Sequence, residues 1–205
     1  MTTPLRPDEP RPKKPAGAAV LQADVTDAIV DAAFAELASA GYGRMSLEAI
    51  AKRAGVGKTA IYRRWSSKQE LVVSIVTTVA LAALDLPHGA TLREDLLEYL
   101  SDAERALTHP LAGAIIPDLL AESSRNGGLA EALLAAVRDP RRRKAAGLVD
   151  RAIERGELRA DIDVQLALDI IAGPLYWRLA VVREPRSPDY LSRLTDAIIA
   201  ALESM

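Results

Sequence analysis

The segment from Met45 to Trp65 constrains the fold more than any other part of the chain. It reads Met-Ser-Leu-Glu-Ala-Ile-Ala-Lys-Arg-Ala-Gly-Val-Gly-Lys-Thr-Ala-Ile-Tyr-Arg-Arg-Trp. Ser46 is a favourable N-cap for a short helix that Gly55 ends, and a second short helix follows from about Lys58. Small Ala51 lets the two helices cross closely. This layout predicts a helix-turn-helix.

The second of these helices is predicted to turn a polar face away from the small apolar core. A helix with such a face fits the major groove of DNA, where its N-terminal residues reach base edges. Tyr62 could instead pack in the core, and Arg63 and Arg64 could form a solvated edge. The residues expected to point outward are Lys58, Thr59, Tyr62 and Arg63.

The distribution of charge supports a nucleic-acid partner, although the net charge is −2. Acidic residues outnumber basic ones after Leu71, whereas the helix-turn-helix segment is basic. The bases that occur there without an intervening acid are Lys52, Arg53, Lys58, Arg63, Arg64 and Lys68.

The composition argues against most catalytic and metal sites. The chain has no cysteine and only His88 and His109 as histidines, which leaves little for a disulfide, a thiolate metal site or a histidine base. It also lacks a Glu-x-x-His pair and a Gly-rich phosphate loop. We therefore expect no metal, no cofactor and no enzyme activity.

The sequence predicts an all-α fold. Ala and Leu dominate the apolar residues, and they rank high in helix propensity. We expect a flexible proline-rich basic tail over 1–20, a three-helix DNA-binding domain over 21–70, and a helical bundle for effector binding and dimerisation over 71–205. The tail either has no role or reaches a DNA minor groove. The expected helices cover 24–40, 47–53, 58–65, 67–84, 91–109, 111–125, 129–155, 164–183 and 188–202. Ser67 and Glu70 are expected to form a capping box at the start of 67–84. Pro117 is expected to interrupt 111–125, and Pro140 to kink 129–155 or divide it into two helices. The basic run 141–144 is expected to be a solvated surface, and a second DNA contact there is not expected.

Residues 29 to 71 carry a long and specific combination of motifs. These are Ala32-Ala33, Gly41-Tyr42, Ser46, Ile50-Ala51, Ala54-Gly55-Val56, Ile61-Tyr62, an aromatic residue at 65, Lys68 and Leu71. In this combination the segment closely resembles the DNA-binding region of the tetracycline-repressor-like (TetR) family.

The resemblance implies a role for individual residues in binding double-stranded DNA. Gly57 stands where the family usually has Ser or Thr as the cap of the recognition helix, so a hydroxyl that could bind DNA is lost. Positions that face bases and the nearby backbone match Lys58, Thr59, Ala60, Tyr62 and Arg63. Positions that hold phosphates match Ser46, Tyr62, Arg64 and Lys68.

The remainder of the chain resembles the regulatory domain of the same family weakly, most clearly over 151–163 and 166–178. These stretches look like one common subgroup of the family. In that subgroup the helices enclose an effector pocket, and the last two helices pair across a two-fold axis. Ile170, Trp177 and Val181 suggest a second buried face on the first of these helices. The candidate interface residues are Leu175, Leu179, Val182, Leu194 and Ile198. The candidate pocket residues, each of which could also be an ordinary structural residue, are Tyr99, His109, Tyr176 and Trp177.

The leading hypothesis is a homodimeric repressor that an apolar small molecule releases from a palindromic operator. The alternative is a DNA-binding dimer that responds to a protein partner or to nothing. The N-terminus lacks the apolar run of a signal peptide, and no membrane span is expected. The sequence therefore predicts a cytoplasmic protein.

Overall fold

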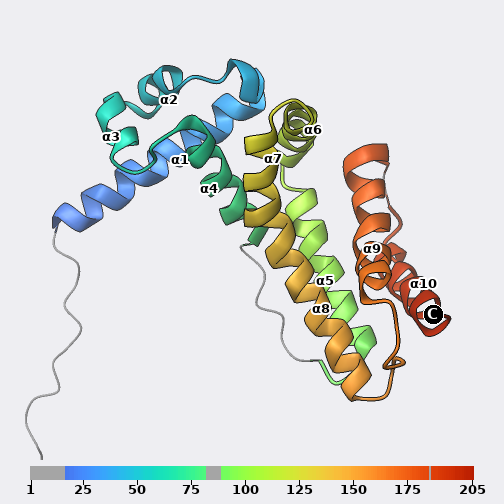
Figure 1. Cartoon of the computed structure of the whole chain (residues 1–205). Helices are drawn as coiled ribbons and strands as arrows, with labels where there is room; N and C mark the ends of the chain where they lie inside the picture. Colours follow the sequence, from blue (N-terminus) through green and yellow to red (C-terminus); the bar gives the residue numbers. More distant parts are fainter. Residues whose placement is uncertain (1–16, 82–88, 185) are drawn as a thin grey trace, which may run out of the picture.

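The computed structural model describes residues 17–81, 89–184 and 186–205, and all the regular structure in them is helical (Figure 1). This confirms the all-α fold. Residues 1–16 of the predicted tail, His88 and the predicted end of the fourth helix lie outside the described residues. The predicted tail was too long, because residues 17–20 belong to the first helix.

The first four helices form the N-terminal part of the molecule. They are α1 (Gly17–Arg44), α2 (Leu47–Ala54), α3 (Lys58–Tyr62) and α4 (Lys68–Leu81). The Ser46 hydroxyl accepts a hydrogen bond from the Ala49 amide at 3.1 Å, which makes Ser46 the N-cap of α2. Gly55 ends α2 at φ 67°. Helix α3 is shorter than predicted because its helical backbone stops at Tyr62.

Gly41 breaks the regular helix near the end of α1. Its φ of 76° and ψ of 162° are not helical. A side chain there would also collide, because an added Cβ would lie 2.5 Å from Oδ1 of Asp118. Glycine is therefore required at this position for its backbone conformation and for the close approach of α6.

The remaining helices form the larger bundle. They are α5 (Leu92–Leu107), α6 (Ala112–Ser123), α7 (Gly127–Leu133), the π-helical turn η1 (Leu134–Arg138), α8 (Asp139–Glu154), α9 (Val164–Tyr176), the π-helical turn η2 (Trp177–Val182) and α10 (Tyr190–Glu203). Figure 1 shows α5 and α8 side by side, with α9 and α10 at the far edge from α2 and α3.

The prolines shape these helices differently from one another. Pro117 lies inside α6 without breaking it, so the predicted interruption is wrong. Pro140 follows the π-helical turn η1, and Pro174 precedes the π-helical turn η2. Such turns let a helix continue where a proline disturbs its hydrogen bonds. The last helix begins at Tyr190 rather than at Pro188, after a turn in which the Tyr190 amide donates to the Ser187 carbonyl.

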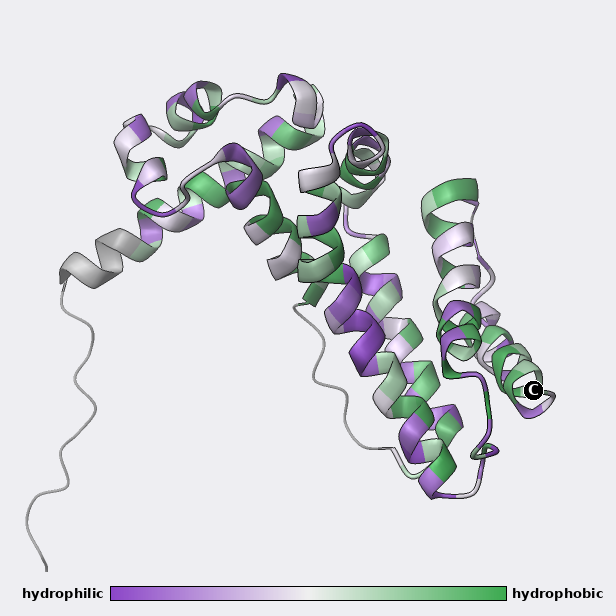
Figure 2. Cartoon of the chain, in the orientation of Figure 1, coloured by the Kyte–Doolittle hydropathy of each residue, from purple (hydrophilic) through white to green (hydrophobic). Residues whose placement is uncertain are grey.

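Two apolar clusters hold the molecule together. The first joins α1 to α4 with α6 and α7, around fully buried residues such as Ile29, Leu37 and Leu71. The second joins α5, α8, α9 and α10 around Leu96, Leu148 and others. Figure 2 shows polar residues gathered on the N-terminal half of α8, where its basic run lies. Helix α6 thus belongs with the DNA-binding end, although it lies within the second half of the sequence.

Candidate DNA-binding face and ligand cavity

Helix α3 presents a polar face to solvent. Lys58, Thr59, Tyr62 and Arg63 are exposed, while Ile61 is fully buried. Tyr62 is 54% exposed, so the alternative that it packs in the core is wrong. The face has no acid of its own, and its side chains are available for contact with a partner. Ala60 differs because it is partly buried against the first apolar cluster.

The recognition helix α3 begins without a side-chain cap. Gly57 occupies the N-cap of α3 with φ −78° and ψ 149° and offers no side chain to cap the helix. Lys58, which follows it, is paired with Glu48 of α2, with 3.2 Å between Nζ and Oε2. Both side chains are well exposed, so this ion pair is weak and can be exchanged for another partner.

Two of the predicted phosphate contacts, Arg64 and Lys68, also hold the fold. Arg64 donates from Nε to the Thr26 hydroxyl at 2.7 Å and from Nη1 to the Ala60 carbonyl at 2.9 Å. Lys68 donates to the Tyr42 carbonyl at 2.8 Å and lies over the Tyr42 ring at 4.4 Å from its centroid. These contacts fix the recognition helix relative to α1.

The turn before α4 is closed by Glu70. Its carboxylate accepts hydrogen bonds from the amide and the hydroxyl of Ser66, which lower the pKa of Glu70. The Ser67 hydroxyl accepts from the Glu70 amide at 3.1 Å. Ser67 therefore caps α4 as predicted, but the glutamate reaches back to Ser66 instead of completing a capping box at Ser67.

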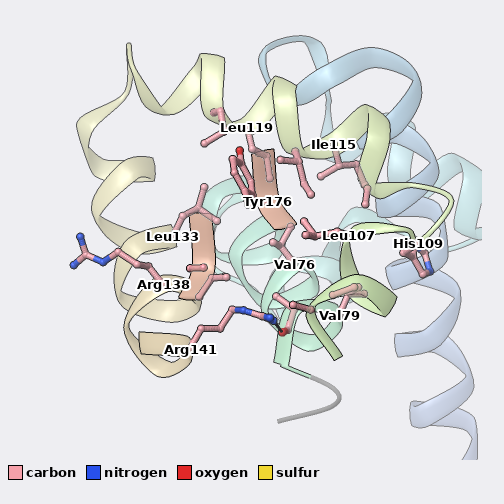
Figure 3. Close-up of a pocket in the computed structure, with 18 of the residues that line it drawn as sticks. Val76, Val79, Leu107, His109, Ile115, Leu119, Leu133, Arg138, Arg141 and Tyr176 are labelled. Carbon is pink, nitrogen blue, oxygen red and sulfur yellow. Dashed lines mark hydrogen bonds between the residues drawn. The ribbon is translucent and has the colours of Figure 1, made fainter. Parts of the chain in front are cut away.

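A cavity of about 750 Å³ lies in the bundle, bounded by α4, α5, α6, α7, η1, α8 and α9. Its wall is almost entirely apolar, as the side chains of Val76, Val79, Leu107, Ile115 and Leu119 illustrate (Figure 3). A cavity of this volume has the size and lining of a site for a small organic ligand.

Three of the four predicted pocket residues line this cavity, namely Tyr99, His109 and Tyr176. Burial raises the pKa of both tyrosine hydroxyls. The prediction for Trp177 was wrong. Trp177 is 61% exposed and is not part of the wall, because η2 turns it toward the outside of the bundle.

The polar groups of the cavity are few. Figure 3 shows Arg138 pointing away from the other labelled side chains and Arg141 pointing toward Val79. Arg138 is paired with Asp139, and Asp169, the acid on the wall, is paired with Arg142. Arg141 also lines the cavity, and the sequence did not predict this because Arg141 belongs to a basic run that was expected to be solvated.

The candidate dimer residues do not share one surface. Leu175 and Ile198 are 1% and 2% exposed within a single chain, and Leu179 and Leu194 pack against the same core, so these four contribute mainly to the bundle. The assignment of Leu175 and Ile198 to a dimer surface is therefore corrected, whereas that of the partly buried Leu179 and Leu194 stays a prediction. Among the described residues of the last helices, the large apolar side chains that are exposed are Leu166, Trp177, Val181 and Val182.

The segment Val164–Val182 is also long and apolar enough to span a membrane by length and composition alone, which the sequence analysis did not anticipate. A single segment of this kind is weak support for a membrane protein, since helices that pack inside soluble proteins pass the same test.

Comparison with known proteins explains this combination of a helix-turn-helix and a cavity. Residues 29–75 match the model of bacterial regulatory proteins of the tetR family, and residues 86–198 match the tetracyclin repressor-like C-terminal domain. The chain belongs to the TetR family.

The relatives of this TetR-family chain are transcription regulators. It is 31% identical to the DNA-binding transcriptional repressor TetR of Mycobacteroides abscessus, over 79% of this chain and 85% of that protein. It is 30% identical to the uncharacterized HTH-type regulator YdeS of Bacillus subtilis, over 82% of this chain and 84% of YdeS. These matches identify the chain as a DNA-binding regulator.

Solved structures of the family share the fold. The regulator SCO0332 superposes with a TM-score of 0.66 at 28% identity, covering 86% of this chain and 97% of that structure. The regulator FadR of Bacillus subtilis, solved in complex with stearoyl-CoA, has a TM-score of 0.72 at 22% identity, covering 87% and 98%.

Proposed function

We propose that this TetR-family regulator is a repressor that binds a palindromic operator as a homodimer and releases it when an apolar small molecule enters the cavity. One observation carries the proposal. Helix α4 begins at Lys68, beside the recognition helix, and its later residues Val76, Val79 and Ala80 line the cavity. A ligand that prefers one position of α4 therefore shifts the population of the DNA-binding form.

The exposed face of α3 supports the DNA-binding half of the proposal. Lys58, Thr59, Tyr62 and Arg63 are assigned to base edges and the nearby backbone, and Ala60 and Gly57 to close backbone approach. Ser46, Arg64 and Lys68 are assigned to phosphates, as the resemblance to the family implies. Contacts to phosphates position the protein, and contacts to bases select the sequence.

The apolar face of α9 and η2 supports the dimer. Leu166, Trp177 and Val181 are exposed and recur at helical spacing along this segment. Large apolar side chains exposed along one helix face mark a candidate interaction surface. We assign the dimer to this face, where Val182 adds to its edge, so the apolar segment meets a second copy rather than a membrane. We place the protein in the cytoplasm.

The proposed function is tested by selecting bound sequences from a random pool of double-stranded DNA with the full-length chain. We expect enrichment of an inverted repeat whose half-sites are about one helical turn or a multiple of it apart. The double variant Lys58→Ala, Arg63→Ala is the control and should enrich no such repeat. Enrichment of single, non-repeated sites would contradict the homodimer, and absence of any enrichment would contradict operator binding.

The release step is tested on the selected operator. An apolar ligand that binds the cavity should weaken operator binding. Ala106→Trp, which places a large side chain in the cavity, should abolish this response while leaving DNA binding intact. A response that survives Ala106→Trp would favour regulation by a protein partner or another site.

A further inference from the structure

Arg141 is a cation on the wall of an apolar cavity. It lies in the first turn of α8 and is half-buried. Its Nη1 donates a hydrogen bond to the Ala80 carbonyl at 2.7 Å, and its guanidinium lies 5.9 Å from the centroid of the Tyr99 ring. It also lies close enough to the Tyr99 hydroxyl to lower the pKa that burial raises. All these partners are neutral.

The other charged groups of the cavity wall differ from Arg141 in this respect. Arg138 is neutralised by Asp139, and Asp169 by Arg142, with 2.7 Å in each ion pair. Among the residues that the structure describes, no carboxylate lies within ion-pairing distance of Arg141. A charge in apolar surroundings is costly when no opposite charge accompanies it. Within the described part of the chain, Arg141 therefore has no negative charge to balance it.

We propose that the effector of this cavity is an apolar molecule with a single anionic group, such as a carboxylate or a sulfonate, and that Arg141 binds that group. The proposal rests on the proposed function, since it assigns a ligand class to the same cavity. The apolar body lies against residues such as Val76, Leu107 and Ile115. A guanidinium suits the anion because its planar array of donors matches a carboxylate or sulfonate geometrically.

The same contact connects the ligand to α4. The Ala80 carbonyl belongs to the last described turn of α4 and accepts the hydrogen bond from Arg141. An anion on Arg141 competes with this neutral acceptor, because charge-assisted hydrogen bonds are stronger than neutral ones. Binding therefore weakens a contact between α8 and α4, the helix whose first residue, Lys68, lies beside the recognition helix.

The test uses two fluorescent probes with the full-length protein. Anilinonaphthalenesulfonate is an apolar anion, and phenylnaphthylamine is the same molecule without the sulfonate. Both are titrated into the wild type, Arg141→Met, Arg141→Lys and Arg138→Met, and each Kd is measured from the fluorescence. Arg138→Met is the matched control, since it removes a neighbouring cation of the wall whose charge Asp139 already balances and whose side chain points away from the other labelled side chains in Figure 3.

We expect the wild type to bind the sulfonate at least about tenfold more tightly than the neutral probe, the scale of a hydrogen bond to a charged group. Arg141→Met should lose this preference but bind the neutral probe as the wild type does, which also shows that its cavity is folded. Arg141→Lys should retain part of the preference, and Arg138→Met should retain all of it. Equal binding of both probes to the wild type, or a preference that survives Arg141→Met, would overturn the proposal.

The outcomes separate this proposal from the proposed function. If both probes bind equally and Ala106→Trp blocks both, the cavity takes apolar ligands and only the assignment of Arg141 fails. If neither probe binds the wild type, the ligand class and the small-molecule response fail together, while operator selection still tests DNA binding alone.

Discussion

The Asp118 carboxylate accepts a hydrogen bond from the Tyr42 amide, with 2.6 Å between the oxygen and the nitrogen. The two residues are far apart in the sequence, because Asp118 belongs to α6 and Tyr42 to the end of α1. Asp118 also fills the space where Gly41 lacks a side chain. Helix α6 therefore carries cavity residues on one side and a contact to the start of the helix-turn-helix on the other.

Gly41 and Asp118 should be energetically coupled. Gly41→Ala should destabilise the protein by about 1 to 3 kcal/mol, because the left-handed backbone is strained for alanine and the new methyl group collides with Asp118. Asp118→Ala should cost a similar amount through the lost hydrogen bond to Tyr42. Chemical denaturation of both single variants and the double variant measures the coupling. The double variant should be less destabilised than the sum, and strict additivity would show that the two residues do not interact.

Glu48 should compete with DNA for Lys58. Lys58→Ala should lower affinity for the selected operator by about 1 to 3 kcal/mol and relax preference at one symmetric pair of positions, if Lys58 reads a base. Glu48→Gln should instead raise operator affinity at low salt, because it removes the ion pair that Lys58 must leave. Both are measured by fluorescence anisotropy, with Lys52→Ala as a control on the same helix. Uniform loss across a randomised operator library would remove Lys58 from the base contacts.

Lys68 should affect both folding and salt dependence. Lys68→Ala should lower the Tm without DNA, since it removes hydrogen bonds to the Tyr42 and Met45 carbonyls. It should also weaken binding to all sequences about equally and flatten the slope of log K against log salt by about one unit. A lower Tm with an unchanged slope would leave Lys68 with a structural role only.

The dimer should depend on the exposed face of η2. Trp177→Glu should place a carboxylate in the apolar interface and produce a monomer by light scattering, with loss of operator binding. Ala121→Glu on α6, which is also exposed, is the control and should leave the dimer unchanged. A Trp177→Glu variant that remains dimeric would place the interface on another surface.

The DNA-binding end could be predicted from the sequence because its signals are local. Ser46, Gly55 and the outward residues of α3 lie within a short segment, where spacing alone decides which side chains face the core. The proline at position 117 misled the prediction of α6 because the helix accommodates it. Contacts such as Tyr42 with Asp118 leave no local signal, since they join distant parts of the chain.

The faces of the last helices could not be predicted for a different reason. The segment Val164–Val182 is apolar on most sides, so periodicity does not distinguish a core stripe from an interface stripe. Packing decides it. Leu175 is buried in the second cluster, whereas Trp177, only two residues later, faces outward. Arg141 was likewise missed because its basic neighbours suggested solvent.

The exposed stripe of Leu166, Trp177 and Val181 has a consequence for the cellular concentration at which the regulator can act. If folding of this bundle is completed by a second copy, its melting temperature rises with protein concentration, as mass action requires for any dimer. A regulator whose concentration falls toward the Kd of its own dimer is then partly monomeric. Dilution at cell growth would lower the number of DNA-competent dimers faster than it lowers the number of chains, so the response of the regulated genes to repressor dosage becomes steeper than proportional.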